Sequence, residues 1–246
     1  MALFTQIKHL RILIVFHLSV IIYSFGYSQS LTGSTGLLRI PTANLSEDKT
    51  LIIGASFLNK HLLNYSGFQY DAIAAYATIT FLPFLEMGIR YTRKIDMPRI
   101  EYETREFADR MPSFRLRVFK EREYTPALAL GGNDFISSIT GGPHYFASYY
   151  AVMTKTLFTK NENIGLEITL GHAFKIGNPH YYDLLGFFGG IRLVHPNYPW
   201  VSAMIDYDSR YWNTGFRFFL FKHLQIMPVL RNGKSFEGSL SYWIYL

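Results

Sequence analysis

The sequence has 246 residues, of which 24 are Lys or Arg and 18 are Asp or Glu, giving a formal net charge of +6. It contains no cysteine, which excludes a disulfide framework, a thiolate metal site and a cysteine nucleophile. Charged residues make up only 17% of the chain, whereas a typical soluble domain has about 25%. Together with 21 Phe, 18 Tyr and 3 Trp, this composition indicates a surface that is largely not in water. The length suits one β domain or two small domains.

Residues 1–28 have the pattern of a cleaved export signal. Lys8 and Arg11 precede a short apolar run over 12–25, and small residues follow at 26–28. The run is shorter than the roughly 20 residues that a membrane-spanning helix needs. We therefore expect a signal peptide over 1–28 and a mature domain over 29–246, whose net charge without Lys8 and Arg11 falls from +6 to +4. An uncleaved amphipathic anchor is the alternative interpretation.

The segment 31–48 does not alternate and contains the Ile40-Pro41 step, which argues against a central strand. We expect a non-strand N-terminal element here. It would either lie inside a barrel or pair at the barrel seam.

The rest of the chain alternates with a period of two. In the clearest case, 85–92, apolar side chains occupy every odd position from Leu85 to Tyr91, and the even positions carry polar residues or glycine. This pattern places all apolar side chains on one face of a strand. The same division appears over 113–118, 164–171 and 201–208. Less regular alternation covers 50–58, 70–81, 124–132, 144–155, 184–194, 211–220, 222–230 and 237–246.

These segments predict an all-β fold with about twelve strands, within a range of ten to fourteen. A soluble β-sandwich would also alternate, but its polar face would meet bulk water and tolerate abundant Lys and Glu. Here Tyr and Trp gather at strand ends, as they do in the aromatic girdles of membrane barrels. No later stretch is apolar for 18 uninterrupted residues, so the sequence predicts a transmembrane antiparallel up-and-down β-barrel rather than membrane helices.

Two further segments complete the predicted barrel. Residues 94–112 form the longest charged connection and are expected to be a loop, either on the surface or folded into the lumen. The last segment alternates through Leu240, Tyr242, Ile244 and Leu246 to the final residue, which is typical of a strand that closes a barrel. A buried terminal strand of a soluble sandwich would show the same pattern.

Three stretches together resemble the YjbH-type outer-membrane proteins of exopolysaccharide and capsule biosynthesis. The first is the opening motif Gly36-Leu37-Leu38-Arg39-Ile40-Pro41-Thr42-Ala43, which is followed by Asp48. The others are the strand pairs over 84–92 with 123–135, and 205–208 with 211–217. The sequence departs from the family pattern at Asn44, Lys49 and Asp206. The resemblance implies an outer-membrane barrel that assists the assembly or export of a surface polysaccharide, with no catalytic residues to transfer.

The inward face of the predicted strands carries a candidate lumen charge cluster. Its members are Arg90, Arg115, Arg117, Arg192, Arg217, Glu86, Glu167, Asp206 and Asp208. One interpretation is a basic constriction for an anionic polymer, because charged rings set selectivity in other pores. The other is that these residues form ion pairs that fill a plugged barrel, because charges removed from water need partners.

Other candidates for chemistry are weaker. Asp206 and Asp208 share a face, which allows the hypothesis of hydrolysis by paired carboxylates. His144, His172, His180, His195 and His223 show no metal-ligand spacing, and the glycines at 131–132 and 141–142 are not followed by a phosphate-binding Lys-Ser or Lys-Thr. A Ser-His pair at the rim stays open as a hypothesis, although no Gly-x-Ser-x-Gly element is present.

The sequence therefore predicts a non-enzymatic protein of the bacterial outer membrane, without a cofactor or metal, that assists exopolysaccharide or capsule assembly or export. The expected partners are outer-membrane lipid, a surface polysaccharide and envelope export proteins, with no nucleic acid. The alternatives are an enzyme at the barrel rim that acts on lipid or glycan, and a structural barrel that binds a partner protein.

Overall fold

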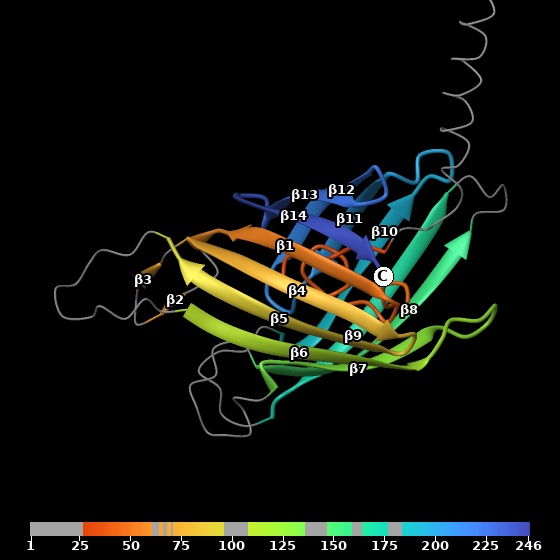
Figure 1. Ribbon diagram of the computed structural model, residues 1–246, viewed down its shortest axis with the longest axis horizontal. Coiled ribbons are helices and arrows are strands. Elements are labelled where there is room, and N and C mark those ends of the chain that lie inside the picture. Colours follow the sequence, from red (N-terminus) through yellow and green to blue (C-terminus); the bar gives the residue numbers. More distant parts are fainter. Residues whose placement is uncertain are drawn as a thin grey trace, which may run out of the picture.

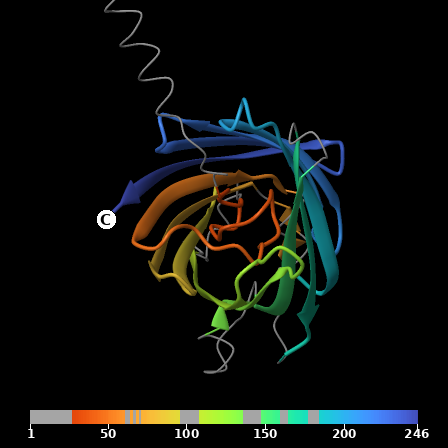
Figure 2. The ribbon, with the colours of Figure 1, turned by 90° about the vertical axis from the view of Figure 1, so that its right-hand side faces the viewer.

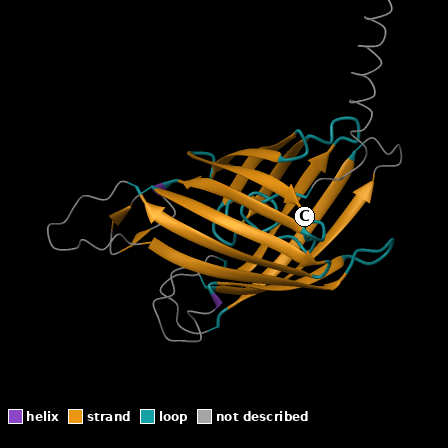
Figure 3. Ribbon diagram, in the orientation of Figure 1, coloured by secondary structure: helices purple, strands orange, loops and turns teal. Residues whose placement is uncertain are grey.

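The computed structural model describes residues 27–60, 64–65, 68–69, 71–95, 108–135, 147–158, 164–176 and 184–246. Strands make up most of this part of the chain (Figure 3). None of the described residues form a helix long and apolar enough to cross a membrane. The predicted signal peptide lies outside the described residues except for Tyr27 and Ser28.

Twelve antiparallel strands close into one barrel (Figure 1). In chain order these strands are β1 (Thr50–Leu58), β4 (Ala72–Leu82), β5 (Leu85–Lys94), β6 (Ala108–Phe119), β7 (Ala127–Asn133), β8 (Ser148–Phe158), β9 (Gly165–Phe174), β10 (Gly186–Val194), β11 (Val201–Tyr207), β12 (Trp212–Leu220), β13 (Leu224–Arg231) and β14 (Ser235–Tyr245). A separate two-stranded sheet, β2 (Asn64–Tyr65) and β3 (Phe68–Gln69), lies in the connection between β1 and β4. The prediction of an all-β, up-and-down barrel of about twelve strands is confirmed.

The barrel closes where its first and last strands pair. Thr50 is opposite Tyr245 and Phe57 is opposite Gly238 in the β1–β14 register, while the other edge of β1 pairs with β4. Each strand of the barrel thus has a neighbour on both sides. Closure leaves no open sheet edge, which removes the unpaired backbone groups that an edge strand would expose.

The period-two pattern of the sequence becomes an outer and an inner face. In β5 the exposed residues include Met87 and Ile89, and the residues that flank this pair, Glu86 and Arg90, are buried. In β9, Leu170 is 60% exposed whereas Glu167 is 6% exposed. The wall is therefore apolar on the outside and carries many polar and charged side chains on the inside, the reverse of a water-soluble barrel.

The expected loop over 94–112 is shorter than predicted. Lys94 still belongs to β5, and β6 begins at Ala108, with Arg93 opposite Ala108 in the register. This part of the strand was not predicted, because the charged residues at 109–110 interrupt the apolar alternation on which the prediction depended. Residues 96–107 of the predicted loop lie outside the described residues.

The two ends of the barrel differ in their connections. One end carries the connections 83–84, 120–126, 159–164, 195–200 and 221–223, together with the start of β1 and the end of β14. The opposite end carries 59–71, 95–107, 134–147 and 175–185, as well as the two short connections 208–211 and 232–234. We call the first the short-turn end and the second the long-loop end.

Candidate functional site

The lumen contains the chain that precedes the first strand. Residues 27–46, which we call the plug segment, lie inside the ring of strands, where the red and orange trace is seen in Figure 2. Its apolar side chains are fully buried: Leu31, Leu37, Leu38, Ile40, Ala43 and Leu45. All of these except Leu45 pack in one apolar cluster with small wall residues such as Ala72, Ala74 and Ala129. Of the two places predicted for the segment 31–48, the structure shows the interior.

The motif Gly36 to Pro41 forms a tight turn within the plug segment. The N–H of Leu37 donates to the carbonyl of Ile40 at 2.9 Å, and Gly36 and Pro41 form a bridge. A Cβ atom on Gly36 would lie 2.2 Å from the carbonyl oxygen of Ile40, so only glycine allows this approach. The turn leaves the N–H groups of Leu38 and Arg39 pointing away from it, toward the wall.

Asp206 on β11 accepts hydrogen bonds from both of these N–H groups. The N–H of Leu38 donates to Oδ2 at 2.9 Å and that of Arg39 at 2.8 Å, while the side-chain amide of Asn213 donates to Oδ1 at 2.8 Å. The carboxylate is fully buried. Because a buried charge requires polar partners, this arrangement satisfies the carboxylate and the turn at the same time.

The Arg39 side chain connects the same turn to two other strands. Its Nε lies 3.1 Å from Oδ2 of Asp208, just after β11, and its Nη1 lies 2.7 Å from Oε2 of Glu237 on β14. Arg231 on β13 reaches the same two carboxylates at 3.5 and 3.8 Å. Two arginines thus face two carboxylates, and the formal charges of this buried group balance.

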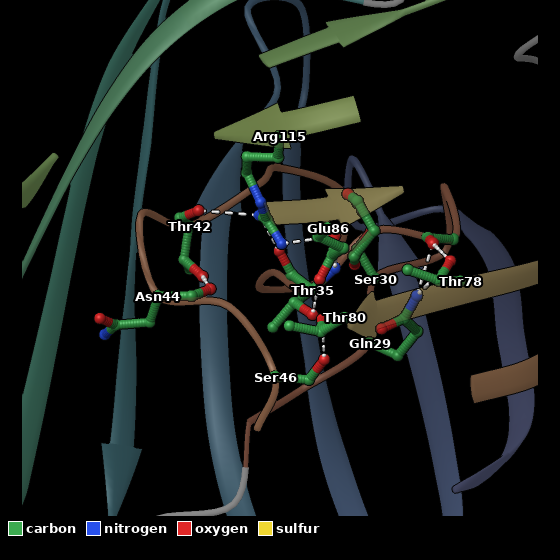
Figure 4. A network of polar contacts seen from close by, with 12 residues as sticks. Gln29, Ser30, Thr35, Thr42, Asn44, Ser46, Thr78, Thr80, Glu86 and Arg115 are labelled. Carbon is green, nitrogen blue, oxygen red and sulfur yellow. Dashed lines mark hydrogen bonds and ion pairs between the residues drawn. The ribbon is translucent and has the colours of Figure 1, made fainter. Parts of the chain in front are cut away.

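A second buried group holds the plug segment against β5 and β6 (Figure 4). Nη2 of Arg115 lies 2.7 Å from Oε1 of Glu86, and Nη1 donates to the carbonyls of Thr42, at 2.8 Å, and Thr35. Glu86 in turn accepts from the N–H and the hydroxyl of Thr35. Both carbonyls and the hydroxyl belong to the plug segment, so this ion pair fixes the segment as well as bridging two strands.

The other predicted residues lie at separate places around the wall. Arg192 pairs with Glu167 at 2.9 Å. Arg90 donates to the carbonyl of Thr32 at 3.3 Å, and Arg217 donates to the carbonyls of Tyr27 at 2.7 Å and Pro199 at 3.0 Å. Arg117 is half-buried at the short-turn end and donates to the carbonyl of Pro83. The nine candidates therefore form several groups, most of which contact the plug segment, rather than one ring.

Three members of the most highly charged group were not among the predicted lumen residues: Arg39, Arg231 and Glu237. Glu237 alternates with the exposed Phe236 on the last strand, so its inward position could have been inferred. Arg39 stands in the opening motif, but nothing in a local pattern shows that it meets Glu237, 198 residues further along the chain.

The two carboxylates considered for hydrolysis are engaged in contacts within the protein. No group of three or more His, Asp or Glu side chains among the described residues could hold a metal ion. Asp206 and Asp208 both lie on the inner face, but their oxygens are engaged by main-chain N–H groups, Asn213 and the arginines described above. His144 and His180 lie outside the described part of the chain.

Burial also affects the Tyr27 side chain at the start of the plug segment. Its pKa is raised, chiefly because burial disfavours the phenolate, with Glu47 and Glu167 adding to the effect and Arg117 and Arg192 opposing it. Tyr27 therefore lies near charged groups of both signs at the short-turn end and stays a neutral phenol at neutral pH.

Comparisons with known proteins show which family the chain belongs to. The family model of the exopolysaccharide biosynthesis protein YbjH matches residues 28–182, which include the plug segment apart from Tyr27 and the strands from β1 to β9. The chain is also 28% identical, over 187 residues, to a protein of Escherichia coli (strain K12) described as the uncharacterized lipoprotein YjbH. That alignment covers 70% of this chain and 24% of the relative, so the chain spans about a quarter of the relative's length. This chain belongs to the YjbH family of exopolysaccharide biosynthesis proteins.

Proposed function

We propose that this protein is a non-enzymatic β-barrel of the bacterial outer membrane that assists the assembly or export of an exopolysaccharide. The observation that carries the proposal is the inverted wall, apolar outside and charged inside, in a closed barrel of a family named for exopolysaccharide biosynthesis.

The outer surface supports a location in lipid. Outward residues that are exposed and apolar recur on neighbouring strands, for example Leu170 on β9, Ile191 on β10 and Phe216 on β12. A broad groove of about 670 Å³ on this face is lined almost wholly by apolar side chains from β7 to β12. In water such a surface would cause aggregation, whereas in a bilayer it is the expected exterior of a barrel.

Aromatic residues at the strand ends support the same location. Trp200 and Tyr198 are exposed at the short-turn end. At the long-loop end the rings of Tyr207 and Trp212 lie 5.3 Å apart. Such residues form girdles at both interfaces of outer-membrane barrels, because their rings are apolar and carry one polar group.

The asymmetry of the connections supports an orientation. Outer-membrane barrels have short periplasmic turns and longer extracellular loops. By this rule the short-turn end faces the periplasm, and the plug segment enters the lumen from that side. The expected partners are then outer-membrane lipid around the wall, a polysaccharide, and envelope proteins that act with the barrel in export.

The position of the plug segment in the lumen limits the role that we propose for the barrel in polysaccharide assembly or export. It is tied to the wall at Asp206, Glu237, Glu86 and Arg115, so the lumen of this state is filled rather than open. We therefore propose a role in assembly, or in an export step that is coupled to movement of the plug, in place of free passage through a permanently open pore.

The proposal is tested in the bacterium that carries the gene. Deletion should strongly reduce surface polysaccharide, and the wild-type gene should restore it, with the protein recovered in the outer-membrane fraction. The matched control is Lys234→Gln, an exposed change in the β13–β14 turn, which should restore polysaccharide fully. Unchanged polysaccharide in the deletion strain, or recovery of the protein outside the outer membrane, would refute the proposal.

A further inference from the structure

A polar pocket of about 320 Å³ opens at the short-turn end of the barrel, beside the plug segment. Its wall residues come from the ends of β6, β8 and β10, the start of β9 and the connection that follows β6, and the plug segment contributes Tyr27 and Asn44. The charged side chains that line it are Arg117, Lys120, Glu121, Glu167 and Arg192. The volume is at the lower end of the range of about 300–1,000 Å³ that small-molecule sites occupy.

The two carboxylates of the pocket already have cationic partners. Glu121 lies 3.3 Å from Nζ of Lys155 and accepts from the N–H and the hydroxyl of Thr156. Glu167 pairs with Arg192 at 2.9 Å. No acidic side chain in the described part of the chain lies within ion-pair distance of Arg117 or Lys120. The pocket therefore carries a net positive charge, contributed by Arg117 and Lys120.

Asn44 adds a neutral hydrogen-bonding group to this charge. Its main-chain carbonyl oxygen accepts from the Thr42 hydroxyl at 3.1 Å, but its side chain points away from the Arg115–Glu86 group (Figure 4). The side-chain amide of Asn44 makes no hydrogen bond to any residue that the structure describes. An amide offers both donors and an acceptor, which suits the hydroxyl groups of a sugar.

We propose that this pocket binds a sugar unit that carries a carboxylate, such as a uronic acid residue of the exopolysaccharide. Arg117 supplies a planar guanidinium that matches a carboxylate, Lys120 adds a second positive charge, and Asn44 and Thr156 face the ring hydroxyls. The inference rests on the proposed function and adds the chemical class of the polymer. In the proposed orientation the pocket faces the periplasm, so the sugar unit meets the barrel before it is exported.

The test is a binding titration of the full chain in detergent with trigalacturonate, and with galactotriose as the neutral counterpart. Trigalacturonate should bind, with an affinity that falls as salt is added, and galactotriose should bind at least tenfold more weakly. The double variant Arg117→Gln/Lys120→Gln should weaken trigalacturonate binding at least tenfold. The matched control, Lys175→Gln/Lys234→Gln, removes the same charge from exposed positions at the long-loop end and should bind like the wild type.

Two results would overturn the inference: no difference between the Arg117/Lys120 variant and the control, or equal binding of the two trisaccharides. A third arm uses glycerol phosphate, which represents a lipid headgroup, and binding as tight as that of trigalacturonate would assign the pocket to lipid instead.

Failure of the sugar site can be distinguished from failure of the proposed function. If deletion abolishes surface polysaccharide but the Arg117/Lys120 variant restores it fully and binds trigalacturonate unchanged, the function stands and the sugar site fails.

Discussion

The side-chain amide of Gln225 pairs with both polar groups of the Gln29 backbone. The N–H of Gln29 donates to Oε1 of Gln225 at 2.9 Å, and Nε2 of Gln225 donates to the Gln29 carbonyl at 2.7 Å. Both residues are fully buried, so one side chain on β13 takes the place of a neighbouring strand for the first part of the plug segment. The pairing satisfies the buried backbone groups of Gln29, which would otherwise lie inside the barrel without partners.

Replacing Gln225 with Leu should loosen the start of the plug segment while the barrel remains intact. The change leaves the N–H and carbonyl of Gln29 without partners, at a cost of about 1–3 kcal/mol for each group. Hydrogen exchange of the Gln29 amide should accelerate markedly. The outward Ile226→Val on the same strand is the control and should leave exchange unchanged; equal exchange in Gln225→Leu and wild type would contradict the pairing.

The oxygen atoms of Asp206 should contribute more to holding the turn at residues 36–41 than its negative charge does. Asp206→Ala removes the acceptor for the Leu38 and Arg39 N–H groups and should expose residues 36–41 to limited proteolysis. Asp206→Asn retains one carbonyl oxygen and should protect the turn better than alanine does. Protection that is the same in both variants would argue against the proposed contact between Asp206 and the turn.

Arg39→Met should destabilise the protein strongly, because it leaves Asp208 and Glu237 with Arg231 as the remaining arginine of the group. Breaking a buried ion pair by removing one partner costs about 3–5 kcal/mol. Urea unfolding followed by tryptophan fluorescence measures this loss. The double variant Arg39→Met/Glu237→Gln restores the charge balance and should recover part of it, so additive losses from the two substitutions would contradict the coupling.

The sequence predicted the wall better than the lumen, for a physical reason. Strands such as β5 and β9 show their inner and outer faces directly in the alternation around Glu86 and Glu167. The position of the plug segment depends on pairings across the whole chain, such as Gln29 with Gln225, and no local period encodes these. The β2–β3 hairpin was likewise missed, because two-residue strands carry no alternation.

For the charged candidate residues, likewise, the sequence predicted the side of the wall on which they lie but not their partners. The inward position of Arg115 and Asp206 followed from the strand pattern, and both are fully or almost fully buried. Their partners did not follow from it, because Arg115 contacts Thr35 and Thr42, and Asp206 contacts main-chain groups of Leu38 and Arg39. A carboxylate that binds backbone N–H groups has no signature in the sequence of its partner.

The most direct test of the central claim, a barrel whose apolar face meets lipid, uses the absence of cysteine in the chain. Single variants Ile168→Cys, Thr169→Cys and Leu170→Cys on β9 are spin-labelled in reconstituted vesicles, and their collisions with oxygen and with a water-soluble nickel chelate are compared. We expect labels at 168 and 170 to collide mainly with oxygen, as in lipid, and the label at 169, whose native threonine is fully buried, to be shielded from both. Preferential collision of the labels at 168 and 170 with the nickel chelate would show that this face is in water and that the barrel does not lie in lipid.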